Sequence, residues 1–443
     1  MTSYEKALGT LERVAEDVRS GDTYTSERQE DILLYNAVGR VAAADYTSPA
    51  ATPRFDTSAM DGYAVCSEAT THASPENPLI LQVRGSIAAG DEPVVLNKEV
   101  FHGFAEPCLE IMTGGIFPNV ADSKRQFDAC VRIEDTAMVS NTPEKGCQIM
   151  ITKPVLPDAN RRFAGCDMQA GEKILRKGDT IRSSHILPLA SVGATVLKVF
   201  RKPRVAVWST GKELVSRDAS HIPDINGPFL MAALQELGAE PKFLGILNDN
   251  EMDVREALQE AVDGNQFDMV ITSGGVSVGK YDFIAPAVIS LGGTVCFHGV
   301  SIRPGHPVLF AQVPSRFRNI PFFGLPGNPG ATAACFRFLV APFMRHLHEQ
   351  PTEKPIMAKF EDSWQVSSGC KKTTSPGLPP LTHFRHGILR QDQQGDMVVE
   401  LSKQQSPAKL GPFTSANCWV QMSGSSYKGL VPCYSTSSST SFL

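Results

Sequence analysis

The sequence predicts a multidomain protein in which an α/β domain with a mainly parallel sheet is joined to β-rich modules. From about residue 203, strand-like runs alternate with helical patterns, in the order RVAVWSTG, PFLMAALQELGAE, PKFLGIL, MDVREALQEAVDG and FDMVITSGG. This βαβαβ order gives a mainly parallel sheet, because right-handed crossovers place the helices on its faces. By contrast, residues 50–150 and those after about 352 hold short β-type runs between Gly and Pro turns, which predicts separate β-rich domains.

Helical patterns mark three further segments. In residues 4–19, apolar side chains recur at helical spacing, which predicts an amphipathic helix near the N-terminus. A helix is also predicted toward the end of residues 160–195, after a Pro-containing boundary. The run ATAACFRFLVAPFMRHL, after PFFGLPGNPG, predicts an apolar helix. The Ser/Thr-rich end, STSSSTSF, is typical of a frayed tail.

Composition excludes several classes of protein. Hydrophobic residues make up 42% and charged residues 20% of the 443 residues, which indicates a globular chain. The net charge of −5 provides no general attraction to nucleic acid or to an anionic membrane. No apolar run is long enough for a transmembrane helix, and the first residues lack the apolar core of a signal peptide. We therefore expect a cytosolic protein with no nucleic-acid or membrane partner.

The cysteines are scattered along the chain. There are ten of them, and no two form a CxxC pair. This spacing argues against a zinc site or a disulfide framework, and it predicts reduced thiols that are mostly buried.

Three polar turns follow predicted strands of the α/β domain. In an open parallel sheet, ligands bind beyond the carboxyl ends of the strands. Glycine permits close approach of the backbone, and exposed N–H groups near a helix start can hold phosphate or another oxyanion. Each turn alone also fits a purely structural role, but three on one rim favour an anionic ligand. The turns are Ser209-Thr210-Gly211, Thr272-Ser273-Gly274-Gly275 and Gly324-Leu325-Pro326-Gly327-Asn328-Pro329.

Oxygen-bearing side chains lie beside the same turns. They are Glu213 after the first turn, Asp224 and Asn226 at a predicted helix start, Asp249 after the strand FLGIL, and Asp282 after GGVSVGKY. Hard oxygen ligands of this kind suit Mg²⁺ together with a phosphate ligand. Asp224 and Asp249 also fit a second interpretation, because Asp often caps the first backbone N–H groups of a helix.

Several motifs occur together in one order. They are RFDTSAMDGYAV (54–65), NRRFAGCD (160–167), STGKEL (209–214), IPDING (222–227), TSGGVSVGKYDF (272–283), SIRPGHP (301–307) and GLPGNPGATA (324–333). With these motifs, the chain resembles the molybdopterin molybdenumtransferase family, of the gephyrin E-domain type, over roughly residues 5–425. No single motif is specific, but their combination is.

The resemblance implies four domains and a homodimer whose active site is shared between the subunits. The α/β domain would be doubly wound, with a mainly parallel sheet of the MoaB/Mog type. The expected bounds are 1–52 with 160–195 for an elongated linker domain, 53–159 for a β-rich insertion domain, 196–350 for the molybdopterin-binding α/β domain, and 351–443 for a C-terminal β-barrel-like domain with a frayed Ser-rich tail.

The implied reaction is the insertion of molybdate into adenylylated molybdopterin with release of AMP, and it needs Mg²⁺. The implied partner is a molybdopterin adenylyltransferase that delivers the pterin. Tungstate in place of molybdate stays open. So does a catalytically weakened paralogue that acts as a molybdopterin-binding or scaffold protein. The β regions at both ends of the chain argue against a protein that is itself only an adenylyltransferase.

The resemblance also assigns roles to residues. Catalytic roles fall to Asp61, Thr113, Asp167, Glu213, Asp249 and Asp282. Of these, Glu213, Asp249 and Asp282 would hold Mg²⁺, and Asp61 would reach the site of the partner subunit. The pterin, its phosphates and molybdate would be bound by Ser209, Thr210, Gly211, Asp224, Asn226, Ser273, Gly274, Gly275, Ser277, Gly279, Arg303, Pro304, Gly305, Gly327, Asn328, Pro329, Arg385 and Ser406. In this set, Arg303, Arg385 and Ser406 match a cluster associated with molybdate, since a guanidinium fork suits a tetrahedral dianion.

Five positions near the predicted chemistry depart from the family pattern. Lys212 stands in place of an Asp, Cys166 in place of a Glu, and Gly299, Arg303 and His306 each in place of a Lys. The arginine keeps the charge of the lysine but changes its geometry. A carboxylate beside the metal thus becomes a cation, and His306 is only partly charged near neutral pH. These changes predict either a retuned enzyme or a weakened one.

Two departures lie further from the motifs. Gln405 stands in place of a Gly, and residues 119–135 contain extra sequence. In that stretch, Asp128 with Glu134 best matches a pair of family acids, and Asp122 is the rival of Asp128.

Overall fold

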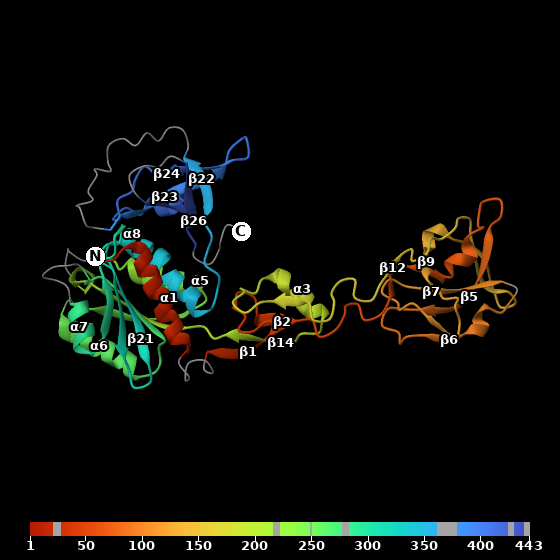
Figure 1. The fold of residues 1–443 in the computed structure, drawn as a ribbon, viewed down its shortest axis with the longest axis horizontal. Coiled ribbons are helices and arrows are strands. Elements are labelled where there is room, and N and C mark those ends of the chain that lie inside the picture. Colours follow the sequence, from red (N-terminus) through yellow and green to blue (C-terminus); the bar gives the residue numbers. More distant parts are fainter. Residues whose placement is uncertain are drawn as a thin grey trace. The chain divides into compact units, whose positions relative to one another are not determined.

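The structure of the protein is a computed structural model. It describes residues 1–20, 28–103, 105–215, 222–248, 250–276, 283–360, 379–423 and 429–437. The chain divides into two compact units (Figure 1). Unit 1 comprises residues 1–44, 177–181 and 196–443, and unit 2 comprises residues 45–176 and 182–195. The four-domain bounds expected from the sequence stay a prediction.

Unit 1 contains a six-stranded sheet that is mainly parallel, as predicted. In order across the sheet, its strands are β16 (Glu240–Leu247), β15 (Arg204–Thr210), β17 (Met269–Ser273), β21 (Asn319–Leu325), β20 (Leu309–Pro314) and β18 (Thr294–His298). The first four run parallel to one another, and the last two are antiparallel to their neighbours. Central strands buried on both faces need near-continuous apolar runs, which is what RVAVW in β15 supplies.

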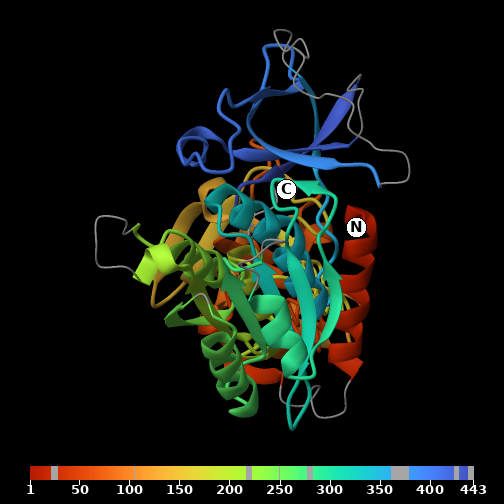
Figure 2. The same ribbon diagram turned by 90° about the vertical axis from the view of Figure 1, so that its left-hand side faces the viewer.

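Helices cover both faces of this sheet (Figure 1, Figure 2). Along β15, Val205 and Val207 belong to one core cluster, whereas Ala206 and Trp208 belong to the other, because side chains alternate along a strand. The first face is covered by α1 (Tyr4–Ser20), α5 (Asn226–Glu236), α8 (Pro329–Cys335), the π-helical turn η5 (Phe336–Val340) and α9 (Ala341–Leu347). The second face is covered by α6 (Glu251–Asp263) and α7 (Ile284–Ser290). The doubly wound α/β prediction is therefore confirmed.

A closed barrel of five strands follows in the same unit, which confirms the predicted β-barrel-like domain. Its strands are β22 (Ile356–Phe360), β23 (Thr382–Gln391), β24 (Met397–Leu401), β25 (Cys418–Ser423) and β26 (Leu430–Ser435). The ring closes because β23 pairs with both β24 and β25. The short α10 (Pro412–Ser415) precedes β25, and β19 (Ile302–Arg303) adds to the outer edge of β23.

Unit 1 also contains an antiparallel ribbon of two strands, β1 (Gln29–Leu33) and β14 (Val196–Phe200). The 3-10 turn η1 (Leu34–Asn36) follows β1. Past the far end of the ribbon the chain enters unit 2 at residue 45, and it returns to β14 after residue 195.

Unit 2 is built around a second six-stranded sheet, which confirms the β-rich prediction. Its strands, in order, are β10 (Ala137–Thr142), β11 (Gly146–Ile151), β5 (Leu79–Ile87), β7 (Glu106–Ile111), β4 (Gly62–Val65) and β9 (Ala129–Arg132). Three short pairs join β2 (Tyr46–Thr47) to β13 (Lys173–Leu175), β3 (Thr57–Ser58) to β12 (Arg161–Arg162), and β6 (Val95–Asn97) to β8 (Asn119–Ala121). The helices are α3 (Ser183–Ser191) and the 3-10 turns η2 (Ser67–Thr70), η3 (Lys98–Phe101) and η4 (Ile133–Asp135).

Two further expectations concern features of the whole chain. In the described ranges, no helix is both long and apolar enough to cross a membrane. The nine cysteines in those ranges are all free thiols, and six of them are buried, as predicted. Cys370 and the Ser-rich tail from residue 438 lie outside the described residues.

Candidate functional site

The three predicted turns lie side by side at one edge of the α/β sheet. β15, β17 and β21 are neighbours and run parallel, so their carboxyl ends meet at this edge. Their last residues are Thr210, Ser273 and Leu325, and a glycine turn begins within two residues of each. We call the carboxyl ends of these three strands, with the turns at 209–211, 273–275 and 325–329, the upper edge.

Asn226, the first residue of α5, connects the second and third turns. Its side-chain nitrogen donates to Ser273 Oγ at 2.8 Å and to the carbonyl of Gly327 at 2.7 Å. Ser273 in turn donates to the carbonyl of Pro326 at 3.2 Å. The two turns are therefore held together before any ligand binds, which reduces the entropy that binding must overcome.

Asp224 connects the first turn to the same helix. Ser209 Oγ donates to Asp224 Oδ2 at 2.7 Å, and the amide of Gly227 donates to Asp224 Oδ1 at 3.0 Å. Asp224 therefore caps the start of α5, as one interpretation of the sequence proposed, and it also fixes Ser209. Position 227 requires glycine, because a Cβ there would lie 2.4 Å from Asp224 Oδ2.

The first and second turns touch through their backbones. Gly274 has a φ of +98°, and a Cβ there would lie 2.4 Å from the carbonyl oxygen of Thr210. Gly275 also has a positive φ, of +68°. On the other side of the first turn, the exposed carboxylate of Glu213 lies beside Gly211, where a Cβ would be 2.7 Å from Oε1. Glycine is thus required where these chains come closest.

Four predicted site residues lie outside the described residues: Ser277, Gly279, Asp249 and Asp282. The cap of α6, which follows Asp249, is Asn250, whose Oδ1 accepts from the amide of Asp253 at 2.8 Å. Among the described side chains, no group of three or more Asp, Glu, His or Cys residues is placed to hold a metal ion. The Mg²⁺ site expected from Glu213 with Asp249 and Asp282 stays a prediction.

Arg303 and Arg385 lie near each other where β19 joins the barrel. Parallel pairing sets Arg303 opposite His383, two residues before Arg385, and the peptide bond from Arg303 to Pro304 is cis. Burial, followed by the charges of Arg385 and Arg303, lowers the pKa of His383 to about 4. The two arginines therefore act on the same buried ring, and such an electropositive neighbourhood suits an oxyanion.

The residues after Pro304 pack tightly. A Cβ on Gly305, which has a φ of +110°, would lie 2.4 Å from Sγ of Cys335 in α8. His306 Nδ1 lies 2.8 Å from the carbonyl of Val300, and its ring lies beside Gly299, where a Cβ would be 3.4 Å from Cε1. The two departures at 299 and 306 therefore occupy one place, with the imidazole ring against the glycine.

Ser406 is exposed in a loop that joins the barrel to the upper edge. The side chain of Gln405 accepts from the amide of His386 at 3.2 Å and donates to its carbonyl at 2.9 Å. The amide of Gly330 donates to the carbonyl of Pro407 at 2.8 Å. Gln405 therefore tethers this loop to β23, which gives that departure a structural role.

On unit 2, Asp61 and Thr113 contact each other. Thr113 donates its amide and its hydroxyl to Asp61 Oδ1, at 2.7 and 2.8 Å. These two hydrogen bonds, the amide first, lower the pKa of the Asp61 carboxyl, so this exposed group is charged at neutral pH.

Asp167 lies on unit 2 as well, and it forms an ion pair with Arg162. The hydrogen bond from Arg162 lowers the pKa of the Asp167 carboxyl, and the Cys166 thiol lies 3.5 Å from Oδ1. β12, which carries Arg162, pairs with β3, and Ser58 of β3 donates its amide to the carbonyl of Gly115. Three segments distant in sequence, around Asp61, Thr113 and Asp167, thus meet in one part of unit 2.

The two rival acids in the extra sequence both have local roles. Asp128 accepts from the amide and the hydroxyl of Ser67, at 2.7 and 2.6 Å, at the start of η2. Asp122 is a turn residue with a φ of +56°. Both belong to unit 2, as Asp61, Thr113 and Asp167 do, and a role of either in the site stays a prediction.

Comparison with known proteins identifies the family. Residues 2–193 match the family model described as the MoeA N-terminal region (domain I and II), and residues 206–346 match that of the probable molybdopterin binding domain. A protein from Nostoc sp., named molybdopterin molybdenumtransferase, is 32% identical over 355 residues, which span 79% of this chain and 77% of the relative. The chain belongs to the molybdopterin molybdenumtransferase family.

Further relatives agree with this assignment. Proteins of the same name from Haemophilus influenzae and Staphylococcus aureus (strain COL) are 32% and 30% identical, and the matches span 89% and 87% of those proteins. Two solved structures of the molybdopterin biosynthesis MoeA protein from Pyrococcus horikoshii superpose with a TM-score of 0.71, at 28% and 24% identity, over 98% of this chain and 99% of theirs. As a member of this family, the protein is an enzyme of molybdenum cofactor biosynthesis.

Sequence reasoning missed several residues that hold this site together. Gly227 in α5 and Thr332 in α8 lie beside the upper edge, and the Thr332 hydroxyl donates to the carbonyls of Pro326 and Asn328 at 2.5 and 3.2 Å. Asn328 is the residue directly before α8, and the amides of Ala331 and Thr332 donate to its carbonyl; Pro329 is the first residue of the helix. A hydroxyl in the otherwise apolar run ATAAC was the available signal for Thr332. Arg162 lies inside a quoted motif, but nothing local pointed to its pairing with Asp167.

Proposed function

We propose that the protein inserts molybdate into adenylylated molybdopterin with release of AMP, in a Mg²⁺-dependent reaction in the cytosol. The observation that carries this proposal is the upper edge: three glycine turns on adjacent parallel strands, held together by Asn226 and Asp224, in a molybdopterin molybdenumtransferase. Adenylylated molybdopterin carries a phosphoanhydride, which is the anionic group such an edge suits.

The residues of unit 1 have separate tasks in this proposal. The turns at Ser209–Gly211, Ser273–Gly279 and Gly327–Pro329 bind the pterin and its phosphates through backbone N–H groups and hydroxyls. Arg303 and Arg385, with Pro304, Gly305 and Ser406 beside them, bind molybdate, since guanidinium groups favour a tetrahedral dianion. Water attacks the phosphoanhydride, the bond to AMP breaks, and AMP leaves.

Glu213, Asp249 and Asp282 are the proposed Mg²⁺ ligands. Glu213 fits this role because its carboxylate is exposed beside Gly211, where the phosphates are proposed to lie. When bound there, Mg²⁺ would offset the negative charge of the phosphates. Lys212, also exposed, adds a positive charge at the same turn.

Asp61, Thr113 and Asp167 belong to unit 2, and we propose that they serve the site of a partner subunit in a homodimer. A charged Asp61, held by Thr113, then faces the reacting groups with a fixed orientation. The adenylylated pterin would be supplied by a molybdopterin adenylyltransferase.

The test follows the products directly. Purified protein is mixed with adenylylated molybdopterin, molybdate and Mg²⁺, and AMP and active cofactor are measured over time. We expect both to appear together and to depend on molybdate. Binding of the pterin without release of AMP would contradict the proposal and favour the weakened, scaffold-type paralogue.

Two variants test the metal and the shared site. Glu213→Gln should raise the Mg²⁺ concentration needed for half-maximal rate, whereas Glu400→Gln, an exposed carboxylate on β24, should leave it unchanged. Mixing Asp61→Asn with Glu213→Gln protein should restore about a quarter of the wild-type rate, since half of the dimers then carry one intact site of two. No recovery in the mixture would exclude a shared site.

A further inference from the structure

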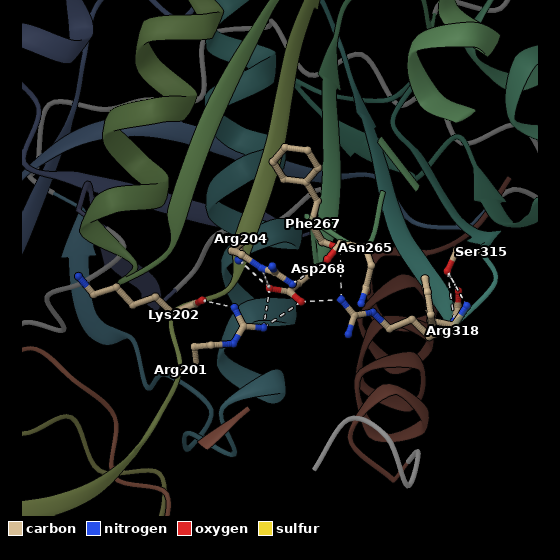
Figure 3. Close-up of polar contacts among 9 residues, drawn as sticks. Arg201, Lys202, Arg204, Asn265, Phe267, Asp268, Ser315 and Arg318 are labelled. Carbon is tan, nitrogen blue, oxygen red and sulfur yellow. Dashed lines mark hydrogen bonds and ion pairs between the residues drawn. The ribbon is translucent and has the colours of Figure 1, made fainter. Parts of the chain in front are cut away.

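A buried carboxylate lies at the opposite edge of the α/β sheet, at the amino ends of its strands. Asp268, directly before β17, is 1% exposed. Figure 3 shows it between guanidinium groups that come from different segments. Arg201 donates to both carboxylate oxygens at 3.1 and 3.0 Å, and Arg318 donates to Oδ1 at 2.6 Å. Arg204 donates its backbone amide to Oδ2 at 2.8 Å. We call these residues, with Arg28, the Asp268 cluster.

The charges of the cluster set its ionisation. Burial alone would raise the pKa of the Asp268 carboxyl, but the amide of Arg204 and the charges of Arg201, Arg28 and Arg318 lower it below its usual value. Asp268 is therefore ionised at neutral pH, and its negative charge attracts the guanidinium groups around it. A charge-assisted contact of this kind is stronger than a neutral hydrogen bond.

Two members of the cluster lie at the near end of the β1–β14 ribbon. Arg28 directly precedes β1, and Arg201 directly follows β14. Their backbones are joined, because the amide of Arg201 donates to the carbonyl of Arg28 at 2.6 Å. Arg204, in contrast, is the first residue of β15, and Arg318 directly precedes β21. Asp268 thus binds the ribbon on one side and the sheet on the other.

The ribbon needs such an attachment. A two-stranded ribbon is marginally stable by itself, so its direction depends on what holds its ends. Beyond its far end the chain enters unit 2 at residue 45 and leaves it after residue 195. Unit 2 carries Asp61, Thr113 and Asp167, which the proposed function assigns to the reaction.

We propose that Asp268, acting through Arg201, is a positioning residue for the transferase reaction, because it fixes to the α/β sheet the β1–β14 ribbon, between whose two strands the chain runs through unit 2. This inference rests on the proposed function, since that function makes the placement of Asp61 matter for turnover. Neither Asp268 nor Arg201 is proposed to touch substrate.

A matched pair of variants tests the proposal in the full-length protein. Arg201→Gln and Arg318→Gln each remove one guanidinium from the same carboxylate, but only Arg201 belongs to the ribbon. Both should lower the unfolding temperature by a similar amount. Only Arg201→Gln should speed hydrogen exchange of the β1 and β14 amides, by about tenfold, which corresponds to about 1.4 kcal/mol. Only this variant should lower kcat, with KM changed little, and Arg201→Lys should restore part of the loss.

The outcomes separate the proposal from its alternatives. Equal ribbon exchange in Arg201→Gln and Arg318→Gln would overturn it, because the cluster would then only add stability. Faster ribbon exchange with an unchanged kcat would overturn the positioning role too. If wild-type protein released no AMP, the proposed function itself would fail, and the exchange measurement would still decide whether Arg201 holds the ribbon.

Discussion

The two edges of the α/β sheet are built from opposite chemistry. At the lower edge, formed by the amino ends of the strands, Asp268 is surrounded by arginines, and the carboxylate is almost fully buried. At the upper edge, neutral hydroxyls, one amide and glycines hold the turns together, with Asp224 accepting from two neutral donors. The same strands thus begin in a charge cluster and end in glycine turns.

This difference separates a structural cluster from a binding edge. The Asp268 carboxylate already accepts from the three arginines, so an added ligand there would have to displace them. At the upper edge, Gly327 and Asn328 are exposed, and neutral side-chain contacts from Asn226 fix the second and third turns. The edge with the greater charge is therefore the stabilising one, and the edge with the smaller residues is the one suited to an anionic ligand.

Removing the charge at the lower edge should have the largest effect on stability. Asp268→Asn leaves the arginines close together without their counter-charge, and breaking a buried ion pair in this way costs about 3–5 kcal/mol. Asp224→Asn at the upper edge loses one of the two hydrogen bonds to this half-buried carboxylate and should cost about 2 kcal/mol. Urea unfolding of both variants at pH 7 measures how much free energy of unfolding each one loses. Equal losses would contradict the contrast between the two edges.

Urea unfolding of wild type and Asp268→Asn at low pH provides a control. The pKa of Asp268 is lowered in the folded state, so its stabilisation is complete above the unfolded pKa of about 4. That stabilisation is lost as the pH falls through the lower folded value. The stabilities of wild type and Asp268→Asn should therefore converge below about pH 4, and parallel curves there would contradict the assignment.

Crowding at the upper edge should give the next largest effect. Gly274→Ala places a Cβ 2.4 Å from the Thr210 carbonyl at a φ of +98°, so the turn must shift, at a cost of about 2–4 kcal/mol. Gly327→Ala is the matched control, because its Cβ would lie 3.7 Å from the nearest atom. Gly327→Ala should keep the unfolding temperature and still weaken pterin binding in calorimetry. If it bound the pterin as well as wild type does, close approach at this turn would be excluded.

Sequence reasoning could predict the upper edge because its signals are local. The alternation of strand and helix patterns predicted that β15, β16 and β17 belong to a mainly parallel sheet, and glycines directly after two apolar strands marked the turns. It could not predict what joins these turns, because Asn226 reaches Ser273 and Gly327, which are 47 and 101 residues away. The choice of such partners depends on tertiary packing and not on any local pattern.

The same limit explains why the lower edge was missed entirely. Asp268 directly precedes the apolar run MVITS, and alone it resembles an ordinary polar residue before a strand. Its partners Arg201 and Arg318 are 67 and 50 residues away. The closure of the barrel through β23 and β25 is likewise a non-local pairing. The residue pattern therefore predicted a domain of short strands, and only the family resemblance predicted that it is barrel-like.

A buried histidine near the ribbon, His348, makes the stability of the fold depend on pH. His348 stacks on Phe200 of β14, and burial, followed by the charges of Arg28 and Arg40, lowers its pKa to about 3. In the unfolded chain the His348 imidazole has a pKa of about 6.5, so as the pH falls the unfolded state takes up a proton before the folded state does. The stability of the fold therefore decreases as the pH drops from 6.5 toward 3. From pH 7 to pH 5, this group should cost about 2 kcal/mol.

His348→Phe keeps a flat ring against Phe200 and removes the titration. Urea unfolding at pH 7, 6 and 5 should show a shallower loss of stability in this variant than in wild type. The pKa values of His383 and His386 are both lowered to about 4. These two histidines change the stability of wild type and variant equally, so they do not contribute to the difference between the two pH slopes. Identical pH slopes would mean that the His348 ring is not held neutral by the fold.

The smallest expected effect on stability tests the upper edge most specifically. Asn226→Ala removes the hydrogen bonds to Ser273 and Gly327, at a cost of about 1–2 kcal/mol. Asn417→Ala in the barrel is the matched control, because Asn417 likewise makes two hydrogen bonds, to the amide and carbonyl of Leu389 at 2.7 and 2.9 Å. Both variants should unfold at similar urea concentrations, but only Asn226→Ala should raise KM for the adenylylated pterin. A KM that rises equally in both would mean that the upper edge responds to general loosening of the fold, and the contrast between the two edges would then lose its functional meaning.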